Sequence, residues 1–220
     1  MSWEYHRDPR PDVQALLSPR GRRILDVGCG AGALGAALKA QGALRVEGVE
    51  AHAEAAAEAA RHLDAVVTGD LTSAPLPFAP GAFDTLVFAD VLEHLSDPSA
   101  ALLRYLPFLA EEGEVVVSVP NMRFYLVLWR LLRDRWAYTD SGIRDRTHLH
   151  IFTRRSLRDL LEGAGLRVET LRRNQRLFED QSQITRAGVV AHRVAVATLG
   201  RVFRDLMAFQ YLAVARRARR

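Results

Sequence analysis

The sequence has one cysteine, one lysine and no long hydrophobic run among its 220 residues. A single cysteine, Cys29, excludes an internal disulfide, and a reducing compartment is therefore expected. The first eleven residues are polar and charged, which does not match a signal peptide. Apolar runs such as residues 125–129 are interrupted by arginine and fall far short of the roughly 20 residues that a membrane-spanning helix needs. These features predict a cytoplasmic protein.

Basic charge is carried almost entirely by arginine and is distributed unevenly. The net charge is −7 over residues 1–113 and +11 over residues 114–220. Arginine binds carboxylates and phosphates through a planar, bidentate fork. A genome that favours arginine would explain the preference over lysine, but it would not explain the asymmetry between the halves. The basic second half could therefore face an anionic substrate, a nucleic acid or a membrane surface.

Short apolar segments alternate with helical segments over the first 121 residues. Strands are expected over residues 22–27, 45–49, 65–68, 83–89 and 114–119. Helices are expected over residues 33–41, 53–61 and 98–110, and Asp97 followed by Pro98 suits the start of the last one. This alternation is typical of a parallel sheet with helices on both faces, which binds ligands beyond the carboxyl ends of its strands.

The second half departs from this alternation. Residues 121–145 form an insertion rich in Arg, Trp and Tyr, and Thr153 is expected to cap a helix that ends near Ala164. Further elements are expected as a strand over 166–171, a long helix over 184–206 and a last strand over 209–214. The chain is predicted to be one domain, residues 1–220, with a core at 22–121 and substrate-side insertions at 122–150 and 173–207.

A glycine-rich loop follows the first expected strand. Gly28 and Gly30 would allow the backbone to approach a ligand closely, and the helix that follows would attract negative charge. Together with Ala33 they also satisfy the dinucleotide pattern G-x-G-x-x-G/A. The loop alone is therefore compatible with a dinucleotide site, with another nucleoside site, or with a tight turn that binds no ligand.

Three acidic residues end the first three expected strands. Glu50 lies 22 residues after Gly28, where a carboxylate can accept hydrogen bonds from both hydroxyls of a ribose. Asp70 could accept a hydrogen bond from an adenine amino group. Asp26 would add negative charge beside a pyrophosphate, whereas a zwitterionic or cationic ligand gives it a role.

Four segments together resemble a known family. Residues 24–32 (ILDVGCGAG), 46–50 (VEGVE), 68–71 (TGDL) and 83–98 (FDTLVFADVLEHLSDP) are similar to the motifs of class I S-adenosylmethionine-dependent methyltransferases. The resemblance implies a Rossmann-like, seven-stranded, mostly parallel α/β sheet with helices on both faces. In that fold the last strand is antiparallel, and we expect helical insertions after strands five and six. It also implies S-adenosylmethionine as cofactor and S-adenosylhomocysteine as product.

The resemblance assigns cofactor-binding roles residue by residue. The methionine part falls to Asp26, Gly28 and Gly30, the ribose to Glu50, the adenine end to Asp70 and Leu71, and the methyl-donor side to Ala89 and Asp90. A sulfonium methyl group is already activated, so the protein must mainly position the nucleophile and exclude water. A base is needed only if the nucleophile begins protonated.

The candidate catalytic residues lie in the second half and after the fourth strand. His148 is the predicted base, because an imidazole with a pKa near neutral suits removal of a hydroxyl proton. A purely structural role for His148 fits the sequence equally well. Asp145 could orient His148 or act as the base itself, and His150 would share a face with His148 in an extended segment. His94 is expected on the acceptor side.

A metal site is a further alternative. Residues 90–94 (DVLEH) resemble the metal-binding E-x-x-E-H pattern of some O-methyltransferases, with Asp90 in place of the first Glu. A histidine at 148 or 150 could complete a set of ligands for Mg²⁺ or Zn²⁺. Carboxylate–histidine pairs at helix starts are common without metal, so no metal is expected.

The acceptor is predicted only by class. Residues 119–121, 138–143 and 145–153 resemble a subgroup of the family that is associated with glycan-building enzymes, which favours O-methylation of a small molecule or a glycan. The alternatives are a nucleic-acid methyltransferase, a non-catalytic cofactor-binding subunit and a dinucleotide oxidoreductase. No nucleic-acid-binding motif is visible, so a nucleic-acid partner is not expected. Residues 122–136 could form a lid, a basic amphipathic helix in peripheral contact with a membrane, or an ordinary helix at the sheet edge. Neither the acceptor itself nor the oligomeric state follows from the sequence.

Overall fold

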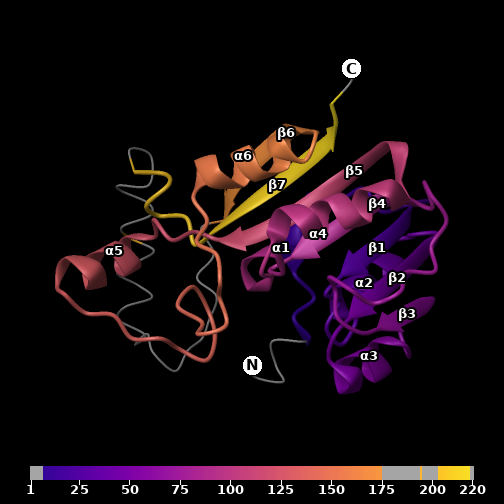
Figure 1. The fold of residues 1–220 in the computed structure, drawn as a ribbon, viewed down its shortest axis with the longest axis horizontal. Helices are drawn as coiled ribbons and strands as arrows, with labels where there is room; N and C mark the ends of the chain where they lie inside the picture. The colour runs from indigo at the N-terminus through magenta and orange to yellow at the C-terminus, as the bar shows by residue number, and fades with distance from the viewer. Residues whose placement is uncertain (1–6, 175–193, 195–202, 219–220) are drawn as a thin grey trace.

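A seven-stranded sheet in the order β3-β2-β1-β4-β5-β7-β6 organises the protein (Figure 1). The computed structural model describes residues 7–174, 194 and 203–218. The strands are β1 (Arg23–Val27), β2 (Arg45–Glu50), β3 (Ala65–Thr68), β4 (Phe83–Ala89), β5 (Leu109–Pro120), β6 (Leu166–Asn174) and β7 (Gln210–Arg217). The first five are parallel, and β7 runs antiparallel to both β5 and β6. The predicted Rossmann-like sheet with its antiparallel last strand is confirmed.

Helices cover both faces of this sheet. The described helices are α1 (Pro11–Gln14), α2 (Ala33–Ala40), α3 (Ala53–Ala59), the 3₁₀ turn η2 (Leu92–His94), α4 (Pro98–Tyr105), the 3₁₀ turn η3 (Leu106–Phe108), α5 (Tyr125–Leu132) and α6 (Arg154–Gly163). Successive strand residues point to opposite faces, so Leu25 joins the cluster beneath α4 and α6 while Ile24 joins the one beneath α1 and α2. The strands are therefore buried on both sides, which explains their nearly continuous apolar sequence.

Local capping fixes where α4 and α6 begin. The Asp97 carboxylate accepts a hydrogen bond from the Ala100 amide at 2.9 Å, and Thr153 forms a capping box with Ser156. The predicted helix over 98–110 was too long, because α4 ends at Tyr105. Pro107 lacks an amide hydrogen and cannot donate the next α-helical hydrogen bond, and the chain passes through η3 into β5.

The last two strands are longer than predicted. β6 and β7 pair from Leu166 opposite Arg217 to Asn174 opposite Gln210, although both strand ends are polar. The apolar pattern predicted that these strands end at residues 171 and 214. They extend further because pairing between backbones does not require apolar side chains. The helical insertion after β5 is confirmed as α5. Most of the predicted helix over 184–206, and most of the insertion over 173–207, lies outside the described residues; Val194 is helical, but residues 203–206 form a bend and a turn, so the helix does not reach its predicted end.

The parallel strands β1 to β5 all end at the same edge of the sheet, and the loops that follow them gather there. This edge carries the site described below. None of the helices in the described part of the chain combines the length and the apolar character that crossing a bilayer requires.

Candidate functional site

A cavity of about 220 Å³ lies at the carboxyl ends of β1, β2 and β4. Of the eight residues predicted to bind the cofactor, seven line it: Asp26, Gly28, Gly30, Glu50, Leu71, Ala89 and Asp90. His94 also lines it, as do two residues of the N-terminal segment, Asp8 and Arg10. The structure therefore brings most of the predicted cofactor residues together at one place.

The loop after β1 presents backbone to this cavity. Gly28 and Gly30 adopt φ angles of +74° and +55°, in the left-handed region that favours glycine. A Cβ atom on Gly28 would lie 2.5 Å from Cγ2 of Val91, so that position also excludes any side chain on steric grounds. The amides of Gly28 and Cys29 donate to the Val49 carbonyl at 2.8 and 3.2 Å, which ties the loop to the end of β2. Gly28 and Gly30 thus give the cavity a fixed wall of exposed backbone, which we call the glycine wall.

Two buried carboxylates flank the loop. Glu50 accepts hydrogen bonds from the Gly30 amide and the His52 amide, both at 2.8 Å. Asp26 is 2% exposed, and its Oδ2 atom has no hydrogen-bond partner. Burial, and then the negative charge of Glu50, raise the pKa of Asp26 to about 7, while the charge of Arg10 opposes this rise. A buried carboxylate oxygen without a donor is costly, so this wall suits a ligand that brings a positive charge or a donor.

Asp70 lies outside the cavity, unlike the other carboxylates that were predicted to bind the cofactor. Its side chain is exposed and does not line the cavity, whereas the next residue, Leu71, does. The Oδ1 atom accepts hydrogen bonds from the Thr72 amide and hydroxyl and from the Ser73 hydroxyl. These hydrogen bonds, Thr72 first, lower the pKa of Asp70. Asp70 therefore shapes the turn after β3, and its contact with an adenine amino group stays a prediction.

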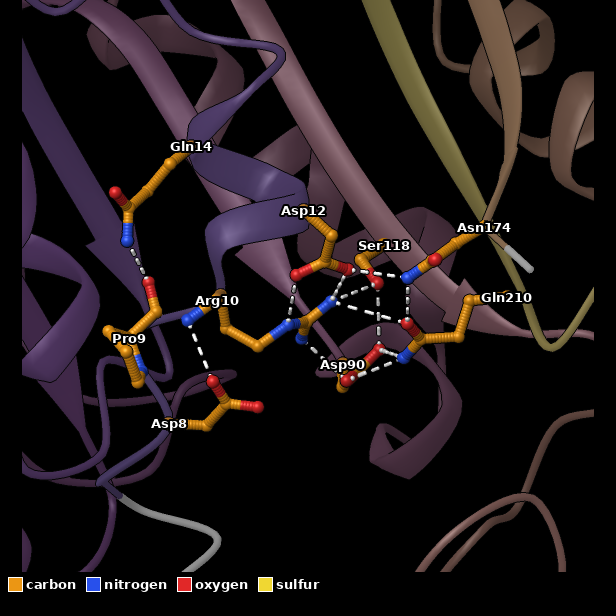
Figure 2. A network of polar contacts seen from close by, with 9 residues as sticks. All are labelled: Asp8, Pro9, Arg10, Asp12, Gln14, Asp90, Ser118, Asn174 and Gln210. Atoms are coloured by element: carbon orange, nitrogen blue, oxygen red, sulfur yellow. Dashed lines mark hydrogen bonds and ion pairs between the residues drawn. The ribbon is translucent and has the colours of Figure 1, made fainter. Parts of the chain in front are cut away.

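Asp90 is held by a network that sequence reasoning missed (Figure 2). Arg10 donates to Asp90 at 2.6 Å and to Asp12 at 3.0 Å, and all three side chains are buried. The Ser118 hydroxyl donates to Asp90 at 2.9 Å, and the Gln210 amide donates to both Asp90 oxygens at 2.9 Å. Asp90 also has a left-handed φ of +56°, which a non-glycine residue keeps only when its surroundings enforce it.

This network joins the N-terminal segment to the last strands. Asn174, at the end of β6, donates to Asp12 at 2.9 Å and to Gln210 at 3.3 Å. Figure 2 shows these side chains converging from the first helix, from β5 and from the β6–β7 pair. Asp90 is thus a wall of the cavity whose oxygens are occupied by partners within the protein. If Asp90 contacts the methyl donor, it does so as a side chain already held in place by hydrogen bonds and not as a free carboxylate.

The predicted acceptor-side histidines lie next to each other. The rings of His94 and His148 are 4.7 Å apart, and His94 is the one that lines the cavity. Nδ1 of His148 lies 3.1 Å from the Ile143 carbonyl, which favours a proton on Nδ1 and leaves Nε2 as an acceptor. Burial lowers the pKa of His148, and burial followed by the charge of His148 lowers that of His94. Both rings are therefore favoured in the neutral form that a base requires.

Asp145 does not orient His148 through a side-chain hydrogen bond in the described part of the chain. Its Oδ1 accepts from the Thr147 amide at 2.8 Å and from the Thr147 hydroxyl at 2.6 Å. Its negative charge still acts on His148 by raising the pKa of that ring, against the larger effect of burial. His150 lies apart from this group, since its Nε2 contacts the Ser96 carbonyl at 3.1 Å.

Glu93 is the most unusual residue at this end of the cavity. It is 1% exposed, and neither carboxylate oxygen has a hydrogen-bond partner. Burial, and then the charge of Asp90, raise the pKa of Glu93 well above its usual value. One ligand atom each from Glu93, His94 and His148 lie within 4.8 Å of one another, and oxygen with imidazole nitrogen suits a divalent ion. The group therefore fits a metal chemically, although none was expected from the sequence.

Comparison with known proteins identifies the family. The family model described as a methyltransferase domain matches residues 3–171. A protein of Paracidovorax citrulli called ubiquinone biosynthesis O-methyltransferase is 26% identical over 184 residues, which is 77% of each chain. A protein of the same name from Thiobacillus denitrificans is 34% identical over 115 residues, 50% of this chain and 48% of its own length. The chain spans about half the length of several such relatives.

Solved structures agree on the fold. A S-adenosylmethionine-dependent methyltransferase from Mesorhizobium loti superposes with a TM-score of 0.63 at 20% identity, covering 98% of both chains. At this identity the likeness supports the fold, and the family match supports the activity. The cavity, with its glycine wall and its unpaired buried carboxylate oxygen, fits the cationic cofactor of that family. The chain therefore belongs to the methyltransferase domain family and is a class I S-adenosylmethionine-dependent methyltransferase.

Proposed function

We propose that this methyltransferase methylates a hydroxyl group of a small molecule or glycan that reaches the cavity beside His94 and His148. The observation that carries the proposal is the pair of adjacent imidazoles next to the cavity, whose pKa values are lowered by burial, with Nε2 of His148 left as an acceptor. A hydroxyl must lose its proton during methyl transfer, whereas a neutral amine or carbon nucleophile has less need of a base. The names of the relatives, which are O-methyltransferases of ubiquinone biosynthesis, agree with this class of reaction.

The cofactor would lie along the glycine wall. Asp26 and the loop at Gly28 and Gly30 would hold the methionine part, where the Asp26 carboxylate faces positive charge. Glu50 would receive the ribose hydroxyls, and Leu71 would cover the adenine. When bound, S-adenosylmethionine supplies a methyl group that is already activated for in-line displacement. The chain's own work is to exclude water, which the apolar lining residues Val91 and Leu95 favour.

His148 would take the proton from the acceptor hydroxyl. The charge of Asp145 would stabilise the imidazolium that forms, in keeping with its upward effect on the pKa of His148. Should a divalent ion bind Glu93, His94 and His148 instead, it would lower the pKa of a hydroxyl bound to it. His148 would then act as a ligand, and its loss would remove metal binding as well as turnover.

Two substitutions test the site. Glu50→Ala should weaken S-adenosylmethionine binding roughly 10- to 150-fold, because hydrogen bonds to a charged acceptor are worth about 1.5–3 kcal/mol. Glu54→Ala, which alters an exposed glutamate on α3, is the matched control. His148→Ala should lower turnover about 100-fold or more while leaving the cofactor dissociation constant unchanged, and His62→Ala on the surface is its control. Calorimetry measures the first effect, and transfer of a labelled methyl group to a panel of catechols and sugars measures the second.

The outcomes separate the alternatives. Unchanged cofactor affinity in Glu50→Ala would remove the ribose assignment, and wild-type turnover in His148→Ala would remove His148 from the mechanism. Transfer to RNA instead of the hydroxyl panel, with binding that weakens steeply as salt rises, would favour the nucleic-acid alternative. Cofactor binding without transfer to any acceptor would favour a non-catalytic subunit.

A further inference from the structure

The outer side of α5 and the loop after it form a large exposed apolar surface. Every residue from 129 to 138 is exposed. Five of these residues are large and apolar or aromatic, with exposures between 38% and 82%: Trp129, Leu131, Leu132, Trp136 and Tyr138. We call this surface, residues 129–138, the α5 face. Several large apolar side chains exposed within ten residues of a folded protein point to a site of interaction.

The α5 face is exposed although the helix is well anchored. On the inner side of α5, Val127 is buried in a cluster with Phe124 and Ile143. The Tyr125 amide donates to the Leu206 carbonyl at 2.9 Å, and the Phe124 ring packs against Phe209 with centroids 5.6 Å apart. Figure 1 shows α5 beyond the tip of β5, set apart from α2 and α3. The helix therefore uses its inner side for the fold and leaves its outer side uncovered.

Positive charge is interleaved with these apolar side chains. Arg130, Arg133 and Arg135 are all exposed, and Asp134 is the single acidic residue between 129 and 138. The Arg133 guanidinium lies 4.0 Å from the centroid of the Trp129 ring. No ion pair joins any of the three arginines to another residue that the structure describes. Burial, and then repulsion by Arg130, lower the pKa of Arg144, so the positive charge extends toward the loop beyond the face.

We propose that the α5 face docks this enzyme on the surface of an anionic lipid bilayer. Tryptophan and tyrosine favour the boundary between headgroups and acyl chains, and exposed leucines next to them in the sequence can enter it. These arginines, which form no ion pair within the described part of the chain, match anionic headgroups, whereas a protein partner would have to supply a matching set of acids. Trp136 and Tyr138 already pack edge to face, with centroids 5.8 Å apart, so part of the surface is formed before contact.

The α5 face is continuous with the acceptor end of the site. Thr139, which follows Tyr138, forms a β-bridge with Asp145, three residues before His148. The exposed side chains of Leu149 and Ile151 lie just beyond, and the Leu149 amide donates to the Glu93 carbonyl at 2.8 Å. This inference rests on the proposed function and deepens it: the acceptor is an amphipathic molecule whose apolar part stays in the bilayer. Its hydroxyl would reach His148 without the molecule leaving the membrane.

Sedimentation with lipid vesicles tests the docking. The full chain is mixed with vesicles of pure phosphatidylcholine or of phosphatidylcholine with about 30% phosphatidylglycerol, and bound protein is measured against salt concentration. We expect binding to the anionic vesicles alone and weaker binding at high salt. Trp129→Glu combined with Leu132→Glu should abolish it, while Leu44→Glu combined with Leu103→Glu alters two other leucines that are more than half exposed and should not.

A charge-matched pair of variants isolates the arginines. Replacing Arg130, Arg133 and Arg135 together by glutamine should weaken binding roughly 100-fold, since each arginine near an anionic surface contributes about fivefold. The same change at the exposed Arg20, Arg61 and Arg155 lowers the net charge equally and should have a small effect. Circular dichroism and calorimetry with S-adenosylmethionine confirm that each variant folds and keeps its cofactor site.

Three results would overturn the docking proposal. They are no binding to anionic vesicles, equal loss of binding in the α5 variants and their controls, or a concentration-dependent dimer that the α5 variants abolish. The last would show that a second copy of the chain covers the face. Methyl transfer to a water-soluble acceptor is measured separately on the same variants. Methyl transfer without vesicle binding would therefore count against the docking proposal alone. Vesicle binding without methyl transfer would count against the proposed function alone.

Discussion

Removing the guanidinium of Arg10 should destabilise the protein more than a typical surface substitution. Arg10→Met keeps most of the apolar stem but leaves the Asp12 and Asp90 carboxylates, each at most 7% exposed, without their shared cation. Breaking a buried pair from one side costs about 3–5 kcal/mol, because an uncompensated charge stays inside. A domain has a total stability of about 5–15 kcal/mol, so this is a large fraction of it. For a chain of this length the melting temperature should fall by roughly 6–20 °C.

Chemical denaturation at neutral pH, followed by circular dichroism, measures this cost. Asp90→Asn removes one of the two charges, so it should restore part of the stability when it is combined with Arg10→Met. A double-mutant cycle should return a coupling energy of about 0.5–3 kcal/mol for the pair. A loss below about 1 kcal/mol in Arg10→Met would refute the reasoning, since losses of that size are ordinary for any substitution. Strict additivity of the two substitutions would refute it as well.

The same variant should change how stability depends on pH. Burial raises the pKa of Asp12, but the hydrogen bond and charge of Arg10, together with backbone hydrogen bonds, outweigh it, so the pKa lies below the usual value. A lowered pKa stabilises the fold above the unfolded-state value and loses that contribution as pH falls through the folded-state value. Arg10→Met lacks this contribution. The stabilities of wild type and variant should therefore differ most near pH 7 and converge below about pH 4.

Two further predictions concern the ligands of the cavity. Because the pKa of Asp26 is raised to about 7, binding of the cationic S-adenosylmethionine should tighten as pH rises from about 6 to about 8 and the carboxylate ionises. Calorimetry in Asp26→Asn should show a flat profile, and a flat profile in the wild type would contradict the assignment. The wild-type chain should also bind Mn²⁺ at Glu93, seen by electron paramagnetic resonance, and release a proton on binding because the pKa of Glu93 is raised. Glu93→Gln should lose this site, and absence of Mn²⁺ binding to the wild type would leave the three side chains as a metal-free group.

Much of the cofactor cavity followed from the sequence, because parallel strands place their carboxyl ends along one edge. Asp26 and Glu50 each come at the end of a short apolar segment, so a correct assignment of the two strands was enough to bring them together. Positive φ angles at Gly28 and Gly30 follow from the same tight turn between strand and helix. The alternation of strands and helices followed from the apolar pattern, whereas the antiparallel last strand came from the family resemblance; both are confirmed.

The remainder depends on contacts between distant residues that leave no local pattern. Arg10 meets Asp90 across 80 positions of sequence, and Gln210 meets it across 120. An arginine between two prolines gives no sign that it will be buried. Asp70 had a readable signal, since a threonine two residues after an aspartate favours a turn in which the carboxylate is used locally. That signal was outweighed by the position of Asp70 at the end of a strand.

The placement of β7 between β5 and β6 has a consequence for synthesis on the ribosome. β6 pairs with β7 and with no other strand of the described sheet, yet it is translated before β7. Until residues 210–217 emerge, its backbone amides and carbonyls have no neighbour, and the side chain of Gln210 is missing from beside Asp90. The nascent chain can therefore form the glycine wall early, but the opposite wall of the cavity must wait for the final strand. Pulse-labelled chains stalled before residue 210 should bind the cofactor more weakly than chains extended past it.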